Sequence, residues 1–143
     1  MFIGSYQHNL DAKGRLTMPA EFRDELGSVV YVTRGFEGCL SVYSEEDFMN
    51  IFNRLKTLKD SNKEARQYIR MFSVNTKKAE IDKMGRINLP GNLIQLAELK
   101  KSCLILGAID RIEIWDEEKW NSFYDEHEDE YESVAESAFK DED

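Results

Sequence analysis

A nine-residue motif occurs twice in this chain, 71 residues apart. The copies are Asp11-Ala-Lys-Gly-Arg-Leu-Thr-Met-Pro19 and Asp82-Lys-Met-Gly-Arg-Ile-Asn-Leu-Pro90, which share Asp, Gly, Arg and Pro at the same positions. The segments 40–48 and 112–120 also match, at an offset of 72. Recurrence at a fixed period is the signature of tandem structural units. The sequence therefore predicts two copies of one small unit, each covering about half of the 143 residues.

A unit of this size is marginally stable alone, so we expect the two units to share one core. No apolar run approaches the roughly 18 residues of a membrane span, and no signal-peptide pattern opens the chain. We therefore expect a cytoplasmic protein without a membrane partner.

Cys39 and Cys103 form no Cys-x-x-Cys pair, so we expect packed, reduced thiols, with a disulfide as the alternative.

The net charge of −9 is concentrated at one end of the chain. Residues 116–143 hold 13 acidic and 2 basic side chains, whereas residues 1–115 hold 15 acidic and 17 basic ones. Local field rather than total charge governs association, so a polyanionic partner is not excluded. We interpret the acidic segment as a solvated helix or a frayed end.

The hydrophobic pattern predicts the order strand, strand, short helix, strand, strand, helix in each unit. Pro19 and Pro90 suit the first turn of the short helices. Helix starts are indicated by Ser44 with Asp47, by Ser61 with Glu64, and by Asp116. The predicted strands are 6–10, 15–18, 29–33, 40–43, 79–82, 86–89, 103–106 and 111–115, and the short helices are 20–26 and 91–96.

The repeated motif has the composition of a tight loop between two strands. Gly14 and Gly85 can take a positive φ at little cost, and the carboxylates of Asp11 and Asp82 can accept hydrogen bonds from backbone amides two or three residues on. We therefore predict that these four residues form the loops.

Arg15 and Arg86 follow the glycines, and we expect them at the loop tips. A guanidinium can bind the O6 and N7 acceptors of guanine in the major groove. Lys13 and Lys83 lie beside the arginines and can neutralise phosphates. The pattern predicts a double-stranded DNA site at Lys13, Arg15, Lys83 and Arg86. The alternative is that each arginine pairs with the aspartate of its own loop, which is compatible with binding.

Catalytic and metal-binding patterns are weak in this sequence. His8 and His127 have no cysteine or carboxylate at metal-ligand spacing, and neither a Gly-x-Ser-x-Gly elbow nor a phosphate loop occurs. We predict no enzyme activity, metal, cofactor or small-molecule substrate. The alternative that we keep is a small hydrolase using Asp11 or Asp82 with His8.

The two motif copies, together with Tyr6-Gln-His-Asn-Leu10, closely resemble the MraZ family of transcriptional regulators, over Met1 to about Tyr124. The resemblance implies an α+β fold, in which two fused AbrB-like β-hairpin units form an intramolecular pseudo-two-fold barrel with flanking helices. We place the first unit at 1–60, a connecting helix at 61–76, the second unit at 77–125 and an acidic C-terminal helix or tail at 126–143.

The resemblance also implies function: a sequence-specific DNA-binding regulator of the division and cell wall gene cluster, acting on its own promoter. Arg-bearing loops of a homo-oligomeric closed ring would contact short direct repeats, in the cytoplasm and associated with the nucleoid. Lys13, Gly14 and Arg15 map onto the first motif, and Gly85 and Arg86 onto the second. Met84 stands where the first copy has Lys13, with Lys83 displaced by one.

A protein-interaction module is the remaining alternative. AbrB-like hairpins also occur in antitoxins, and the stripe of apolar residues within 120–139 could bind a partner protein in that case.

Overall fold

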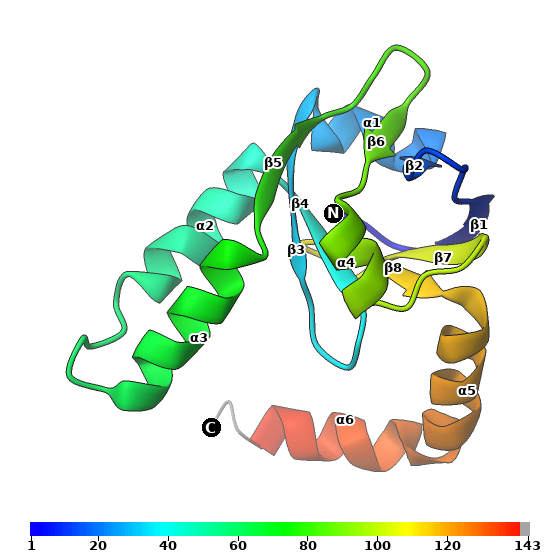
Figure 1. Cartoon of the computed structure of the whole chain (residues 1–143). Coiled ribbons are helices and arrows are strands. Elements are labelled where there is room, and N and C mark those ends of the chain that lie inside the picture. The colour runs from blue at the N-terminus through cyan, green and yellow to red at the C-terminus, as the bar shows by residue number, and fades with distance from the viewer. Residues whose placement is uncertain (141–143) are drawn as a thin grey trace.

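The computed structural model describes residues 1–140, which fold as two halves with the same order of elements (Figure 1). The last three residues of the predicted acidic tail, 141–143, lie outside the described residues. The first half contains β1 (Ser5–Asn9), β2 (Arg15–Thr17), α1 (Ala20–Leu26), β3 (Val29–Arg34), β4 (Leu40–Ser44), α2 (Glu45–Leu55) and α3 (Lys63–Val74). The second half contains β5 (Lys77–Glu80), β6 (Arg86–Asn88), α4 (Gly91–Leu96), β7 (Ser102–Gly107), β8 (Ile112–Asp116), α5 (Glu117–His127), a 3-10 turn (Glu128–Glu130) and α6 (Tyr131–Lys140).

The strands of the two halves interleave. The larger sheet has six antiparallel strands in the order β1-β7-β8-β4-β3-β5, so the first strand of each half pairs with the third strand of the other. When each strand is exchanged for its repeat counterpart, the same order is obtained, read from the opposite edge of the sheet. The two halves are therefore related by a pseudo-two-fold axis. The predicted α+β fold of two repeated units is confirmed.

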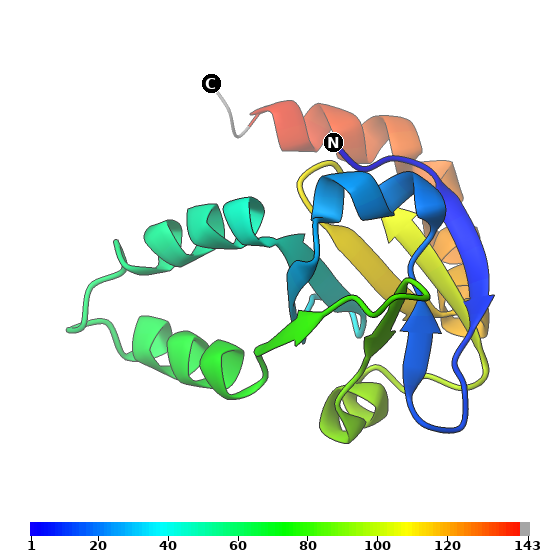
Figure 2. The ribbon, with the colours of Figure 1, turned by 90° about the horizontal axis from the view of Figure 1, so that it is seen from above.

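β1 and β5 lie at opposite edges of the large sheet, and from each the chain continues through a tight loop into β2 or β6 (Figure 2). β2 and β6 meet in a separate two-stranded antiparallel ladder. Across residues 1–140 the hydrogen-bonded ladders form these two sheets and do not by themselves close a barrel.

One hydrophobic core fills the space between the sheets and the short helices. Leu16 and Ile87 contribute from the β2–β6 ladder, and Val30 and Ile105 from the large sheet, all without solvent exposure. Because side chains alternate along a strand, the neighbours of Leu16 and Ile87 in β2 and β6 face outward. Each half thus supplies part of a core that neither could build alone.

Both cysteines are buried and free. Burial raises the pKa of Cys39 to about 12 and that of Cys103 to about 11. Both therefore remain protonated at neutral pH and act as small apolar side chains, and the prediction of packed, reduced thiols is confirmed.

Two of the three predicted helix starts are correct. Ser44 accepts a hydrogen bond from the Asp47 amide, and Asp116 accepts one from the Lys119 amide. The start at Ser61 is wrong, because the side chain of Asn62 accepts from the amides of Glu64 and Ala65 and caps α3 instead.

The last helices of the two halves are arranged differently. In the first half α3 folds back alongside α2, whereas in the second half the 3-10 turn directs α6 away from α5 (Figure 1). The C-terminal segment is therefore two helices with an elbow rather than one continuous helix. No helix among residues 1–140 is long and apolar enough to span a membrane.

Candidate nucleic-acid interface

The loop between β1 and β2 is built by one carboxylate. Oδ1 of Asp11 accepts hydrogen bonds from the amides of Lys13 and Arg15, each at 2.9 Å. Its Oδ2 accepts from Nε of Arg15 at 2.8 Å. Gly14 has a φ of +78°, a conformation that favours glycine. The loop is thus closed by its own side chain, and the arginine is fixed at the same time.

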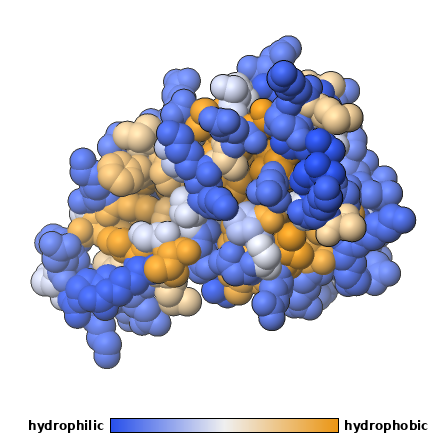
Figure 3. All heavy atoms as spheres, turned by 45° about the horizontal axis from the view of Figure 1, so that its top comes forward, coloured by the Kyte–Doolittle hydropathy of each residue, from blue (hydrophilic) through white to orange (hydrophobic). Residues whose placement is uncertain are grey.

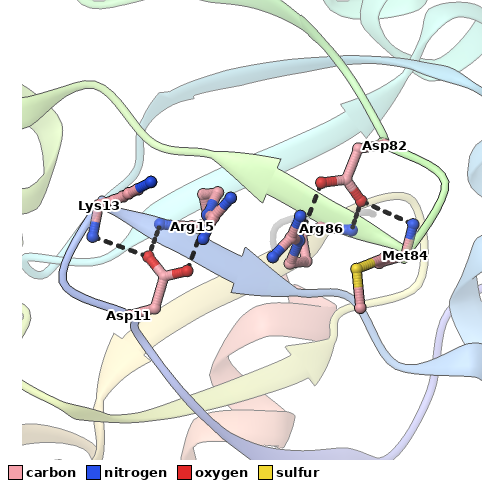
Figure 4. A network of polar contacts seen from close by, with 6 residues as sticks. All are labelled: Asp11, Lys13, Arg15, Asp82, Met84 and Arg86. Carbon is pink, nitrogen blue, oxygen red and sulfur yellow. Dashed lines mark hydrogen bonds and ion pairs between the residues drawn. The ribbon is translucent and has the colours of Figure 1, made fainter.

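The loop between β5 and β6 repeats these contacts. Oδ1 of Asp82 accepts from the amides of Met84 and Arg86 at 2.9 Å, and its Oδ2 accepts from Nε of Arg86 at 2.9 Å. Gly85 has a φ of +80°. Figure 4 shows the two loops at opposite ends of the β2–β6 ladder, with both arginines between them.

The arginines lie at the base of each loop and not at its tip. Arg15 and Arg86 are the first residues of β2 and β6. Each Nε donates to a carboxylate four residues earlier, which folds the side chain back along its own loop. The expectation of arginines at the tips is therefore wrong in this detail, and the exposed basic residues nearest the tips are Lys13 and Lys83.

Both arginines lie on one face of the ladder. In β2–β6, Arg15 pairs with Asn88 and Arg86 pairs with Thr17, while Leu16 and Ile87 between them point into the core. The side chains of Arg15 and Arg86 are 32% and 25% exposed. The structure therefore brings the two arginines together on the outer surface.

The guanidinium groups keep donors available for a ligand. Within residues 1–140, the Nη atoms of Arg15 and Arg86 donate to no protein acceptor, because only Nε contacts the aspartate. A partly exposed ion pair of this kind contributes about 0–1 kcal/mol to stability. Its larger effect is to hold the planar group in one orientation.

The loop aspartates are held in the charged form. The amide of Arg15 lowers the pKa of Asp11 below its usual value of 3.8, and the side chain of Arg15 lowers it further. Asp82 has its pKa lowered in the same way by the amide and side chain of Arg86. A carboxylate with a lowered pKa that already accepts three hydrogen bonds is a poor general base at neutral pH. This argues against the hydrolase alternative with His8, which lies half-buried on β1.

One basic residue near the second loop was missed by the sequence analysis. Nε of Arg23, in α1, donates to the carbonyl of Met18 at 2.8 Å. Its guanidinium packs over Gly85, such that a Cβ on that glycine would lie 2.4 Å from Cζ of Arg23. The repeat counterpart of Arg23 is Ile94, which covers Gly14 in the first loop. The repeat pattern could not have indicated Arg23, because only the first repeat has a basic residue at this position.

Residues 1–140 contain no group of three or more His, Cys, Asp or Glu side chains that could hold a metal ion. The candidate site is thus built by two tandem units, whose basic loops display their arginines on one face of a shared ladder. The family model described as "MraZ protein, putative antitoxin-like" matches residues 1–71 and again residues 71–142. The chain therefore belongs to the MraZ family, a regulator family rather than an enzyme family.

The second family match extends beyond the resemblance seen in the sequence, which ended near residue 124. It runs to residue 142 and includes α5, the 3-10 turn and α6. The acidic C-terminal helices are thus part of the repeated family unit, in the position that α2 and α3 occupy in the first half.

Proposed function

We propose that this protein is a sequence-specific DNA-binding transcriptional regulator whose arginine-bearing loops read short direct repeats in double-stranded DNA. The observation that carries the proposal is the shared outer face of Arg15 and Arg86, each with Nε fixed by an aspartate and the Nη atoms unengaged within the described chain. On the family resemblance, the target is the promoter region of the division and cell wall gene cluster, including the regulator's own promoter.

The chemistry of the face suits a duplex. An oriented guanidinium can bind the O6 and N7 acceptors of guanine, which provides sequence readout. Lys13 and Lys83 are exposed near the loop tips and would contact phosphates, which provides affinity and positions the protein. Arg23 adds a third basic group at the second loop. This addition compensates for Met84 at the position where the first loop has Lys13.

Several weak contacts would act together in a homo-oligomer, which we propose to be a closed ring. Assembly makes each later contact intramolecular and so raises its effective concentration. A regulator of this kind would be cytoplasmic and associated with the nucleoid. The acidic C-terminal segment would lie away from the DNA, because like charges repel the phosphates.

The chain would consist of two fused AbrB-like units that close into a pseudo-two-fold barrel. Within the two family repeats, the barrel-forming parts would be 1–60 and 77–125, with 61–76 as the connecting helix and 126–143 as the acidic C-terminal segment. The pairing of β2 of the first half with β6 of the second supports this view.

The test is the binding of Arg15→Ala and Arg15→Lys to duplexes selected from a random pool, measured by fluorescence anisotropy. We expect Arg15→Ala to weaken binding by roughly 1–3 kcal/mol per site. Arg15→Lys keeps the positive charge but cannot form the bidentate hydrogen bonds of a guanidinium. We therefore expect this variant to lose discrimination for guanine more than it loses affinity. Unchanged binding by a folded Arg15→Ala protein would remove the loop from the mechanism.

A second candidate function is that of a protein-binding antitoxin-like module. The antitoxin-like description of the family and the exposed apolar side chains of α6 favour it. Co-purification of one stoichiometric foreign protein, with no duplex enriched from the random pool, would select this function over DNA binding.

A further inference from the structure

Helix α6 is the repeat counterpart of α3 but lacks the packing that α3 has. In the first half Phe48 of α2 and Phe72 of α3 stack with ring centroids 6.2 Å apart, which closes the helical hairpin. In the second half α6 has no buried residue. Tyr131, Val134 and Phe139 are 80%, 56% and 73% exposed. The apolar face that packs in one repeat is therefore uncovered in the other.

The elbow between α5 and α6 forms an acidic, apolar-lined surface. A concave region of about 750 Å³ is lined by Phe123, Tyr124, His127, Glu128, Tyr131, Val134, Ala135 and Ala138. Residues 125–136 contain seven acidic side chains and no lysine or arginine. Any surface that covers α6 must therefore be apolar at its centre and basic around it.

The α2–α3 hairpin has such a surface. Its outer groove, on the side of β5, has a volume of about 530 Å³ and includes Phe52, Ile69 and Phe72 with Lys56 and Lys78. Residues 54–78 contain eight basic and two acidic side chains. Figure 3 shows hydrophobic residues gathered on the left of the molecule, where the hairpin lies. The exposed apolar residues of the hairpin are Met49, Phe52, Leu58, Tyr68, Met71 and Val74.

A second groove beside the hairpin suits α6 less well. It lies between the hairpin and α5 of the same chain. Its lining has three carboxylates, of Glu37, Asp110 and Glu113, and three guanidinium groups, of Arg34, Arg54 and Arg111, so its formal charge is zero. The lining of the outer groove has Lys56 and Lys78 against Asp60 alone, so it keeps a net positive charge that would attract the acidic side chains of α6. Charge complementarity therefore favours the outer groove.

We infer that α6 of one copy docks in the outer groove of the α2–α3 hairpin of a second copy, head to tail. This inference rests on the homo-oligomer of the proposed function and names its contact. The contact joins two different surfaces, so it can propagate from copy to copy and close into a ring when the rotation permits. It also completes the second half, because a neighbour's helices cover α6 where no helix of its own half does.

The test uses matched aspartate substitutions on each surface, with the mass of the full chain measured by light scattering without DNA. Val134→Asp places a charge in the apolar stripe of α6, and Ser137→Asp places the same charge outside it. Phe52→Asp and Asn53→Asp form the matching pair on α2. We expect Val134→Asp and Phe52→Asp each to reduce the mass to that of one 16.7 kDa chain, and both controls to keep the oligomer.

A mixture of the two disrupted proteins distinguishes this contact from a symmetric one. Val134→Asp retains an intact hairpin and Phe52→Asp retains an intact α6, so the mixture should form a one-to-one pair and nothing larger. A native protein that is monomeric, an unchanged mass for Val134→Asp, or a mixture that stays monomeric would each overturn the inference. DNA binding is a separate readout: Arg15→Ala should keep the full mass, so loss of either property identifies which proposal failed.

Discussion

Leu16 and Ile87 lie directly opposite each other in the β2–β6 ladder, and both are fully buried. They occupy the same position in the two repeats, so the pseudo-two-fold axis passes between them. Because they point inward, Arg15 and Arg86 point outward, on equivalent sites of one surface. The packing of this pair thus determines where the candidate DNA-binding groups are displayed.

Leu16→Ala should destabilise the whole chain and not one loop. Removing a fully buried leucine side chain costs roughly 2–5 kcal/mol, because the cavity is only partly refilled. Since both halves share this core, we expect one cooperative transition at lower denaturant concentration in urea unfolding. Ile87→Val is the mild control, at about 0.5–1.5 kcal/mol. Loss of β2–β6 structure alone, with the large sheet intact, would show that the halves do not fold as a unit.

The loop glycines should respond differently to alanine. Both have positive φ, which costs an alanine about 1–3 kcal/mol. At Gly85 the new Cβ would also lie 2.4 Å from Cζ of Arg23, whereas at Gly14 it would lie 3.3 Å from Cδ1 of Ile94. We expect Arg23→Ala to reduce the cost of Gly85→Ala and to leave that of Gly14→Ala unchanged. The four free energies of unfolding in a double-mutant cycle measure this coupling.

If the coupling between Arg23 and Gly85 is zero, the guanidinium does not rest on the second loop in solution. Gly14→Val should be worse than Gly14→Ala, because a β-branched residue tolerates positive φ poorly. Circular dichroism on each variant separates a local loop effect from loss of the fold.

The loop aspartates should contribute a pH-dependent part of the stability. Their folded pKa values lie below 3.8, so the ionised form is favoured by folding. This contribution is present above the unfolded pKa and is lost as the pH falls below about 3.8 through the folded pKa. We expect the stability of Asp11→Asn/Asp82→Asn to fall less steeply than that of the native chain in this acid range.

Asp24→Asn, which changes an exposed carboxylate of α1 outside the loops, is the matched control. It should retain the native acid dependence of the unfolding free energy. Direct titration of the two loop carboxyls by NMR would give a second check, and midpoints at or above 3.8 would contradict the geometry.

The sequence predicted the repeated elements well because local signals determine them. The short helices at 20–26 and 91–96 agree with the structure, since proline precedes each one and strands flank both. The strand ends shifted by one or two residues, as at Lys77–Glu80. Hydrogen bonding to the neighbouring strand determines these ends, and that partner is remote in the sequence.

Features that depend on contacts between the halves could not be predicted in this way. The packing of Arg23 over Gly85 joins α1 of one repeat to a loop of the other. The position of Arg15 at the loop base depends on where β2 begins, which its pairing with β6 of the other half determines, and its side chain then folds back to donate to Asp11. The elbow before α6 has no repeat counterpart, since α2 and α3 are joined by a longer connection.

The two loop lysines should contribute to affinity mainly through phosphates. Neutralising a phosphate releases counterions, so log K falls with log salt with a slope near −0.9 for each contact. We expect Lys13→Ala and Lys83→Ala to weaken binding similarly for all sequences and to reduce the magnitude of the slope by about 1 per contact.

Lys59→Ala, at the exposed connection between α2 and α3, is the control for total charge. Arg15→Ala should instead change the preferred sequence. Anisotropy titrations of guanine-containing and scrambled duplexes at three or more salt concentrations separate these effects. An unaltered slope for Lys13→Ala and Lys83→Ala would place the phosphate contacts elsewhere, with Arg23 the next residue to test at the second loop.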